Sequence, residues 1–162
     1  MSKKLWLGID NGVSGQVSII GSDSYFLFKT PIKRCLNYTK KKQWVNRIDF
    51  GKLYALLKQF APNIKTAYIE RPLVNPMRFK SSVSALRAYE STIVVLEILK
   101  ISFDTIDSRI WQKDLIPLGV SGPELKQASL QVGMRLFPKI DWSKFDDADG
   151  LLIAEYCRRK NL

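Results

Sequence analysis

Four carboxylates in this sequence stand where they could hold a hard metal ion. Asp10 and Glu70 each end a short apolar run, and residues 146–149 open a helical pattern near the C-terminus. Asp146 and Asp149 lie three residues apart, which would place them on one face of a helix. A buried carboxylate is usually paired with a cation or bound to a metal. We therefore expect four metal ligands: Asp10, Glu70, Asp146 and Asp149.

Oxygen ligands of this kind suit Mg²⁺, and we expect Mn²⁺ to be able to replace it. Two Mg²⁺ ions about 3.5–4 Å apart are a known device for cleaving phosphodiesters, because one activates water and the other stabilises the leaving oxygen. The acids also have simpler interpretations. Asp146 and Asp147 could merely favour a helix N-terminus, and Asp10 and Glu70 could be ordinary solvated or paired acids. The choice between Asp146 and Asp147 as a ligand stays open.

The composition excludes several kinds of active site. The chain has 162 residues and no histidine, which rules out Ser-His-Asp catalysis, Cys-His catalysis and histidine-containing zinc sites. The two cysteines, Cys35 and Cys157, match no CxxC pattern, and we expect free buried thiols. Lys and Arg number 26 against 15 Asp and Glu, so the net charge is +11. Such a charge predicts a polyanionic partner, nucleic acid before an anionic membrane.

Length and hydropathy predict a single domain, residues 1–162, with its own hydrophobic core. Hydrophobic residues make up 46% of the chain and charged residues 25%, as in globular proteins. The longest apolar run, residues 93–101, is interrupted by Glu97 and Lys100, so we expect no membrane span. The N-terminal apolar stretch reaches Asp10 too soon for a secretory signal, and we expect a cytoplasmic protein.

The spacing of apolar residues predicts the elements that position the acids. Five strands are expected, at residues 5–10, 16–20, 25–30, 66–70 and 102–106, of which the first three form an antiparallel meander. Four helices are expected: one after Asp49, one over residues 79–100, one after a capping box at residues 121–124, and one over residues 145–159. This order predicts an α/β fold in which a five-stranded mixed sheet, the meander plus parallel strands, is flanked by helices.

A basic segment and the start of the long helix are the candidates for binding nucleic acid. Residues 33–47 contain no acid, and their cations alternate with aromatic rings that could stack on bases. The candidates in this segment are Lys33, Arg34, Lys40, Lys41, Lys42, Trp44 and Arg47, with Tyr38 among them. The candidates in the long helix are Arg78, Lys80 and Arg87. A solvated hairpin loop is the simpler interpretation of residues 33–47.

Three short motifs occur in order, and together they span nearly the whole chain. Residues 8–15 read Gly-Ile-Asp-Asn-Gly-Val-Ser-Gly, residues 68–70 read Tyr-Ile-Glu, and residues 146–154 read Asp-Asp-Ala-Asp-Gly-Leu-Leu-Ile-Ala. Together they resemble the GxDxGxxxxG opening, the strand-closing acid and the final DxxDAxxxA helix of RuvC-type Holliday junction resolvases. The first motif is slightly shorter than the family's, and Gly150 stands where alanine is usual.

The resemblance implies a ribonuclease H-like fold and a homodimer that makes two symmetric nicks across a four-way DNA junction. It implies that Asp10 bridges two metal ions and that Glu70 binds one of them. Asp149 with Asp146 would bind the other ion.

The resemblance also implies a basic residue near the scissile phosphate. Lys126 is the first candidate for this role and Lys113 the second, although either could be a solvated surface charge. The helix expected at residues 79–100 is the candidate dimer interface, because apolar residues cover more than one of its faces. Burial of these faces in the core is the competing interpretation.

Two departures from the family pattern favour a phage-encoded member that works in a bacterial host. Cellular resolvases carry an aromatic residue shortly after the acid of the second motif, whereas here the apolar wedges are Leu73, Met77 and Phe79. The basic segment at residues 33–47 is also unusually prominent. Phage-encoded members tend to act on many branched structures, so we expect both four-way and three-way junctions as substrates, without strict sequence preference.

Two hypotheses from different classes follow. The first is an endonuclease that nicks branched DNA by two-metal phosphodiester hydrolysis. The second is a non-catalytic protein on the same fold that binds branched DNA and cuts none. An actin-like phosphotransferase shares a similar Asp-Gly turn, but it needs a second domain and a second phosphate loop. A chain of 162 residues leaves no room for these, so no nucleotide cofactor is expected.

Overall fold

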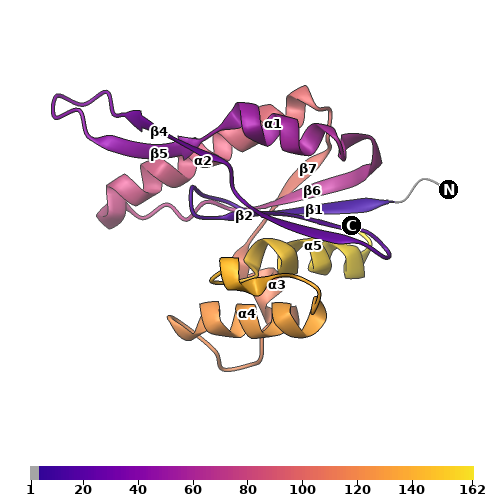
Figure 1. Ribbon diagram of the computed structural model, residues 1–162. Coiled ribbons are helices and arrows are strands. Elements are labelled where there is room, and N and C mark those ends of the chain that lie inside the picture. The colour runs from indigo at the N-terminus through magenta and orange to yellow at the C-terminus, as the bar shows by residue number, and fades with distance from the viewer. Residues whose placement is uncertain (1–3) are drawn as a thin grey trace.

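The computed structural model describes residues 4–162, and its centre is a mixed sheet of five strands (Figure 1). The strands are β1 (Leu5–Asp10), β2 (Gln16–Ile20), β3 (Tyr25–Lys29), β6 (Ile64–Glu70) and β7 (Phe103–Ile106). Their order across the sheet is β3-β2-β1-β6-β7. The first three strands pair antiparallel, and β6 and β7 add on in the direction of β1. The predicted α/β fold with a five-stranded mixed sheet is therefore confirmed.

Helices cover both faces of this sheet (Figure 1). They are α1 (Phe50–Lys58), α2 (Phe79–Ile98), α3 (Ser108–Leu115), α4 (Glu124–Leu136) and α5 (Asp149–Lys160). Helices α1 and α2 lie on one face, whereas α5 lies on the other with α3 and α4 packed against it. Leu7 and Ile9 of the central strand pack toward α1 and α2, and Trp6 packs on the α5 side. Both faces of β1 are thus buried, and the strand is fixed between two cores.

Helix α5 lies close against the sheet because two glycines leave room for it. A Cβ atom at Gly8 of β1 would collide with the carbonyl oxygen of Gly150 and the backbone nitrogen of Ala154. A Cβ atom at Gly150 would lie 3.1 Å from the carbonyl oxygen of Gln16 on β2. The glycine at position 150 therefore lets the first turn of α5 touch the ends of β1 and β2.

The last helix begins later than predicted. We expected it from about residue 145, but a 3₁₀ turn at Trp142–Lys144 is followed by extended backbone at Phe145 (φ −129°, ψ 139°). Helix α5 starts only at Asp149. Residue 146 is therefore outside the helix, and the expected helical face shared by Asp146 and Asp149 does not exist.

Two further helix predictions need correction. The capping box expected at residues 121–124 is wrong, because α4 begins behind Pro123 with no side-chain cap, and Gly122 there adopts a left-handed φ of 58°. Helix α3 was not predicted. It has 8 residues and buries Trp111 alone, which is too little apolar pattern to reveal a period. Its start is fixed by Asp107, whose side chain accepts a hydrogen bond from the Arg109 N–H at 2.9 Å.

The basic segment forms a two-stranded hairpin of β4 (Ile32–Leu36) and β5 (Trp44–Ile48). The hairpin is separate from the main sheet and projects beside the start of α2 (Figure 1). Its strands pair antiparallel, with Leu36 opposite Trp44 and Lys33 opposite Arg47.

Among residues 4–162, no helix combines the length and the hydropathy that crossing a membrane would need. Of the two cysteines, both free thiols, Cys157 is buried and Cys35 is half-buried.

Candidate active site

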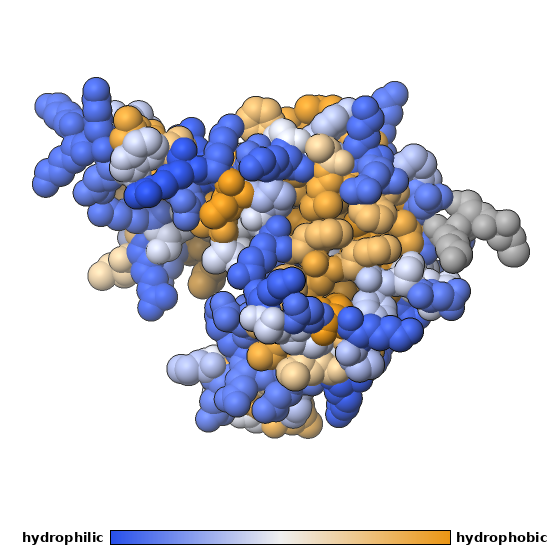
Figure 2. Space-filling view, viewed as in Figure 1, coloured by the Kyte–Doolittle hydropathy of each residue, from blue (hydrophilic) through white to orange (hydrophobic). Residues whose placement is uncertain are grey.

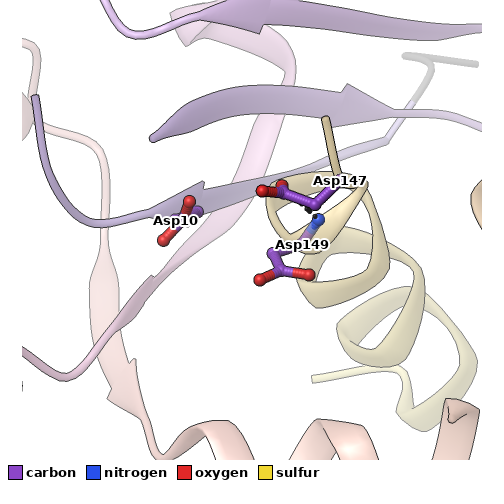
Figure 3. A group of neighbouring side chains, drawn as sticks. All are labelled: Asp10, Asp147 and Asp149. Atoms are coloured by element: carbon purple, nitrogen blue, oxygen red, sulfur yellow. Dashed lines mark hydrogen bonds between the residues drawn. The ribbon is translucent and has the colours of Figure 1, made fainter. Parts of the chain in front are cut away.

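The candidate site lies where β1 ends and α5 begins (Figure 3). There Asp10, Asp147 and Asp149 each offer a carboxylate oxygen, and these oxygens lie within 4.8 Å of one another. Asp10 is the last residue of β1, Asp149 is the first residue of α5, and Asp147 stands two residues before it. Three carboxylates this close repel one another unless protons or a cation lie between them.

Glu70 is the fourth acid of the site. It ends β6, which runs parallel to β1, so Glu70 and Asp10 stand side by side at the same edge of the sheet. The indole nitrogen Nε1 of Trp111 donates a hydrogen bond to Glu70 Oε2 at 3.2 Å. The charge of Glu70 also raises the pKa of Asp10, so the two acids are electrostatically coupled.

Burial and mutual repulsion raise the pKa of three of these acids. Burial is the largest cause for Asp10, and repulsion from Glu70 and Asp149 carries its pKa well above the usual range. Burial, followed by repulsion from Asp149, raises the pKa of Glu70 to about 7, although the hydrogen bond from Trp111 opposes this. Burial raises the pKa of Asp149 to about 6, against a hydrogen bond from Ser129. The site therefore carries more negative charge than the neighbouring cations of the protein compensate.

Asp147 takes the place in this group that we expected of Asp146. Asp147 is buried, whereas Asp146 is exposed. The side-chain amide of Gln16 donates hydrogen bonds to Asp147 Oδ1 at 2.8 Å and to its carbonyl oxygen at 2.7 Å. The physical reason for the exchange is the late start of α5 at Asp149, which leaves residues 146–148 outside the helix, so that Asp146 and Asp149 no longer share a helical face.

Two buried polar residues that the sequence reading missed hold the acids in place. Gln16, opposite Asp10 on β2, binds Asp147 and also accepts the Gly150 N–H through Oε1 at 3.3 Å. Ser129 of α4 donates to Asp149 and accepts the Ala148 N–H at 3.1 Å. For Gln16 a signal did exist, because it is a polar residue at the start of an apolar strand.

The two candidate lysines lie in different surroundings. Lys126, on the first turn of α4, has its Nζ 3.6 Å from Asp147 Oδ2, so it forms an ion pair with one of the clustered acids. Lys113 lies exposed in the last turn of α3, and no described contact connects it to the acids.

The segment after Glu70 presents both apolar and basic side chains beside the site. A cavity of about 230 Å³ is lined by Glu70, Asn11, Arg71 and Arg78, together with Leu73 and the start of α2. The expected apolar wedges are open to solvent, since Leu73, Met77 and Phe79 are 81%, 92% and 72% exposed. Lys80 is exposed as well, and Arg87 is half-buried.

On the hairpin, cations stand over aromatic rings. Arg34 lies 5.4 Å from the ring centre of Trp44, and Arg87 of α2 lies 5.2 Å from that of Tyr38. Lys33 lies 4.5 Å from the ring centre of Phe50. The remaining candidates here, Lys40, Lys41, Lys42 and Arg47, are exposed. The hairpin therefore carries a continuous basic and aromatic surface beside α2.

Comparison with known proteins gives a likeness of structure. No family model and no curated protein matches the sequence. The fold is similar to that of Thermus thermophilus RuvC in complex with a Holliday junction substrate, with a TM-score of 0.63, 11% sequence identity, and coverage of 98% of this chain and 94% of that chain. A second structure of T. thermophilus RuvC matches with a TM-score of 0.57, 14% identity, and coverage of 97% and 96%. The likeness shows that the chain has the ribonuclease H-like fold of RuvC, as the motifs predicted.

Proposed function

We propose that this protein is a divalent-metal-dependent endonuclease that nicks branched DNA. The observation that carries the proposal is the group of Asp10, Asp147 and Asp149, with carboxylate oxygens within 4.8 Å of one another and Glu70 coupled to them. Buried acids without enough internal cations form a site for external ones. The RuvC-like fold with a net charge of +11 points to nucleic acid as the substrate.

The donor set fits Mg²⁺ or Mn²⁺, because all four groups are carboxylates and hard divalent ions prefer oxygen ligands. Asp10, Asp147, Asp149 and Glu70 would hold two such ions. Bound there, the ions supply Lewis-acid activation of water and neutralise charge that develops on the cleaved phosphodiester. Asp146 remains an alternative ligand to Asp147 only if the chain before α5 rearranges.

The other groups of the site would orient these ligands and hold the substrate. Gln16 and Ser129 fix Asp147 and Asp149 through the hydrogen bonds described above. Lys126, 3.6 Å from Asp147, is placed to exchange that partner for a phosphate oxygen of the substrate. Lys113 would contact DNA farther from the cleaved bond.

We place the junction against α2 and the hairpin. Leu73 lines the same cavity as Glu70, and Met77 and Phe79 are exposed on the segment that follows. These apolar wedges could separate bases at a branch point. Cations of the hairpin and of residues 78–87 would bind the phosphates of the junction arms. The proposed substrate class is supported by the matched RuvC, which is in complex with a Holliday junction substrate. We expect four-way and three-way junctions to be cut.

A homodimer would give two symmetric nicks. Helix α2 leaves Leu86, Val94 and Ile98 partly exposed, at 42%, 47% and 62%, and these residues could pack against the same helix of a second copy. Such a dimer would act in the cytoplasm of a bacterial host.

The test is a cleavage panel with labelled four-way junctions, three-way junctions, flaps and linear duplex, with Mg²⁺, Mn²⁺ or EDTA. We expect nicks in branched DNA with either metal and none with EDTA. Asp10→Asn and Glu70→Gln should remove cleavage but keep junction binding in a mobility-shift assay. Asp23→Asn, an exposed acid away from the site, is the matched control.

Two outcomes would count against the proposal. Full cleavage by folded Asp10→Asn would show that these carboxylates do not form the active site. Tight junction binding without any cut product in either metal would favour the non-catalytic junction-binding protein.

A further inference from the structure

The outer edge of the sheet at β3 contains a groove two strands away from Asp10, since Lys29 of β3 pairs with Gln16 of β2 and Gln16 pairs with Asp10. The groove has a volume of about 580 Å³ and is lined by Leu27, Phe28, Lys29, Pro31, Lys52, Leu56, Lys144 and Phe145. Residues of α1 form one wall, and residues just before α5 form the other. Figure 2 shows hydrophobic side chains gathered between α1 and α5 with hydrophilic ones around them. The floor is β3 itself, which pairs with β2 and with no other strand of the described residues.

The backbone of β3 has hydrogen-bonding groups that point into this groove. Thr30 N–H binds Gly15 O at 3.0 Å and Gly21 N–H binds Ser24 O at 2.7 Å, in the register that pairs β2 with β3. Because the direction of backbone N–H groups alternates along an antiparallel strand, Leu27 and Lys29 must point their N–H and C=O groups away from β2. Within residues 4–162, no hydrogen bond from another segment reaches these outward groups.

The side chains of the groove combine an apolar surface with a cationic rim. Phe28 and Leu56 face the α1 side, while Leu27 packs on the α5 side, near Phe145. Lys52 and Lys144 form exposed ion pairs with Asp49 at 3.8 Å and Asp141 at 3.1 Å, and pairs of this kind contribute little. Both lysines therefore remain available to another acid, as does the exposed Lys29.

We propose that β3 is a strand-addition site for an extended, acidic and apolar segment of a partner protein. Such a segment would pair with Leu27 and Lys29 through its backbone and place alternate side chains against the two walls. Its carboxylates would meet Lys29, Lys52 and Lys144. A second copy of this chain fits poorly, because pairing across a two-fold axis would bring two sets of these lysines together. The proposal is independent of the nuclease function.

The first experiment selects a displayed library of random octapeptides on the immobilised full-length protein. We expect enrichment of peptides that combine Asp or Glu with β-branched or aromatic residues. The enriched peptide is then synthesised with a fluorophore and titrated by anisotropy. Lys52→Glu with Lys144→Glu should weaken its binding by about 10-fold or more. Lys58→Glu, an exposed lysine on α1 outside the groove, should leave binding unchanged.

The second experiment measures amide hydrogen exchange by NMR with and without the enriched peptide. The amides of Phe26 and Phe28 should be protected in both states, because they point toward β2. The amides of Leu27 and Lys29 should become protected only when the peptide is bound. Lys29→Pro, which removes the outward N–H, should weaken binding more than Lys29→Ala, which removes only the charge. Circular dichroism checks that each variant is folded.

Several results would overturn the proposal. These are no acidic enrichment, equal binding by Lys29→Pro and Lys29→Ala, or unchanged exchange at Leu27 and Lys29 in the saturated complex. Protection of the same amides by a DNA oligonucleotide would assign the edge to nucleic acid instead. Protection that grows with protein concentration alone would assign it to a second copy.

Discussion

The two ends of α5 each hold buried acids, but the surroundings of these acids differ. At the C-terminal end, Glu155 accepts hydrogen bonds from Arg158 Nε at 2.8 Å and from Arg159 Nε at 2.7 Å. Burial alone would raise the pKa of Glu155, yet the two arginines bring it below its usual value. At the N-terminal end, burial raises the pKa of Asp149 to about 6, and the neighbouring charge of Asp147 adds to this effect.

We propose that this difference separates a structural acid from acids that bind a metal ion. Glu155 carries its own counter-charges within one turn of the helix, so it needs nothing from outside the protein. The acids at the N-terminal end, Asp10, Asp147 and Asp149, have one described ion pair, between Asp147 and Lys126. The side chain of Lys126 is 71% exposed, and this single cation faces several acids. Even the helix dipole at this end leaves the pKa of Asp149 raised. This excess of acids supports the proposal that the group binds an external cation.

The largest effect is expected in the test of which acid, Asp147 or Asp146, binds metal at the N-terminal end of α5. Loss of a residue that only supports a metal ligand lowers activity by roughly 10- to 100-fold. If Asp147 is itself a ligand, we expect Asp147→Asn to lower the cleavage rate by more than this. Asp146→Asn, one residue away and exposed, should change it less than about 3-fold. Single-turnover cleavage of a four-way junction measures both. The opposite ranking would assign the ligand to Asp146.

The second test uses the stability of the metal-free protein as a function of pH. The folded-state pKa of Glu70 is raised from 4.5 to about 7, so the folded state holds a proton there that the unfolded chain has released. The contribution of Glu70 to stability is therefore fully present below pH 4.5 and is lost as the pH rises through 7, by about 2–3 kcal/mol between pH 5 and pH 8.

Urea unfolding in EDTA at pH 5 and pH 8 checks this prediction. Glu70→Gln removes the titrating group and a charge that raises the pKa of Asp10, so the difference in stability between the two pH values should shrink by at least that amount. Equal pH dependence in the wild type and in Glu70→Gln would contradict the raised pKa. Mg²⁺ added at pH 8 should stabilise the wild type more than the variant, because the ion binds the folded state.

The sequence predicted the sheet, and it singled out three of the four acids that the structure brings together, because both depend on local patterns. The meander and Glu70 follow from alternating apolar runs that end at an acid. The choice of Asp147 over Asp146 could not be predicted, since it depends on the chain turning at Trp142–Lys144 and starting α5 only at Asp149. Ser129 could not be recognised either, because its contact with Asp149 joins two helices whose packing no local pattern specifies.

A third test concerns the residues that orient the acids. Gln16→Ala removes both hydrogen bonds to Asp147. We expect the rate of single-turnover cleavage to fall about 10-fold, which is the lower end of the range for losing a residue that supports a metal ligand. If Gln16 acts by positioning, a higher Mg²⁺ concentration should be needed for half-maximal cleavage. Ser18→Ala, a buried residue of the same strand, is the control and should leave the Mg²⁺ dependence unchanged.

The smallest expected effect concerns the C-terminal end of the helix. Glu155→Gln keeps the shape of the side chain but removes the charge that binds Arg158 and Arg159. Because both arginines are partly exposed, at 38% and 47% of their side chains, we expect a loss of about 1 kcal/mol of stability in urea unfolding. Cleavage per folded molecule should be unchanged, whereas Asp149→Asn should lose cleavage and gain stability at pH 8. If Glu155→Gln also lost cleavage, the two ends of α5 would be coupled, and the division between a structural and a functional acid would fail.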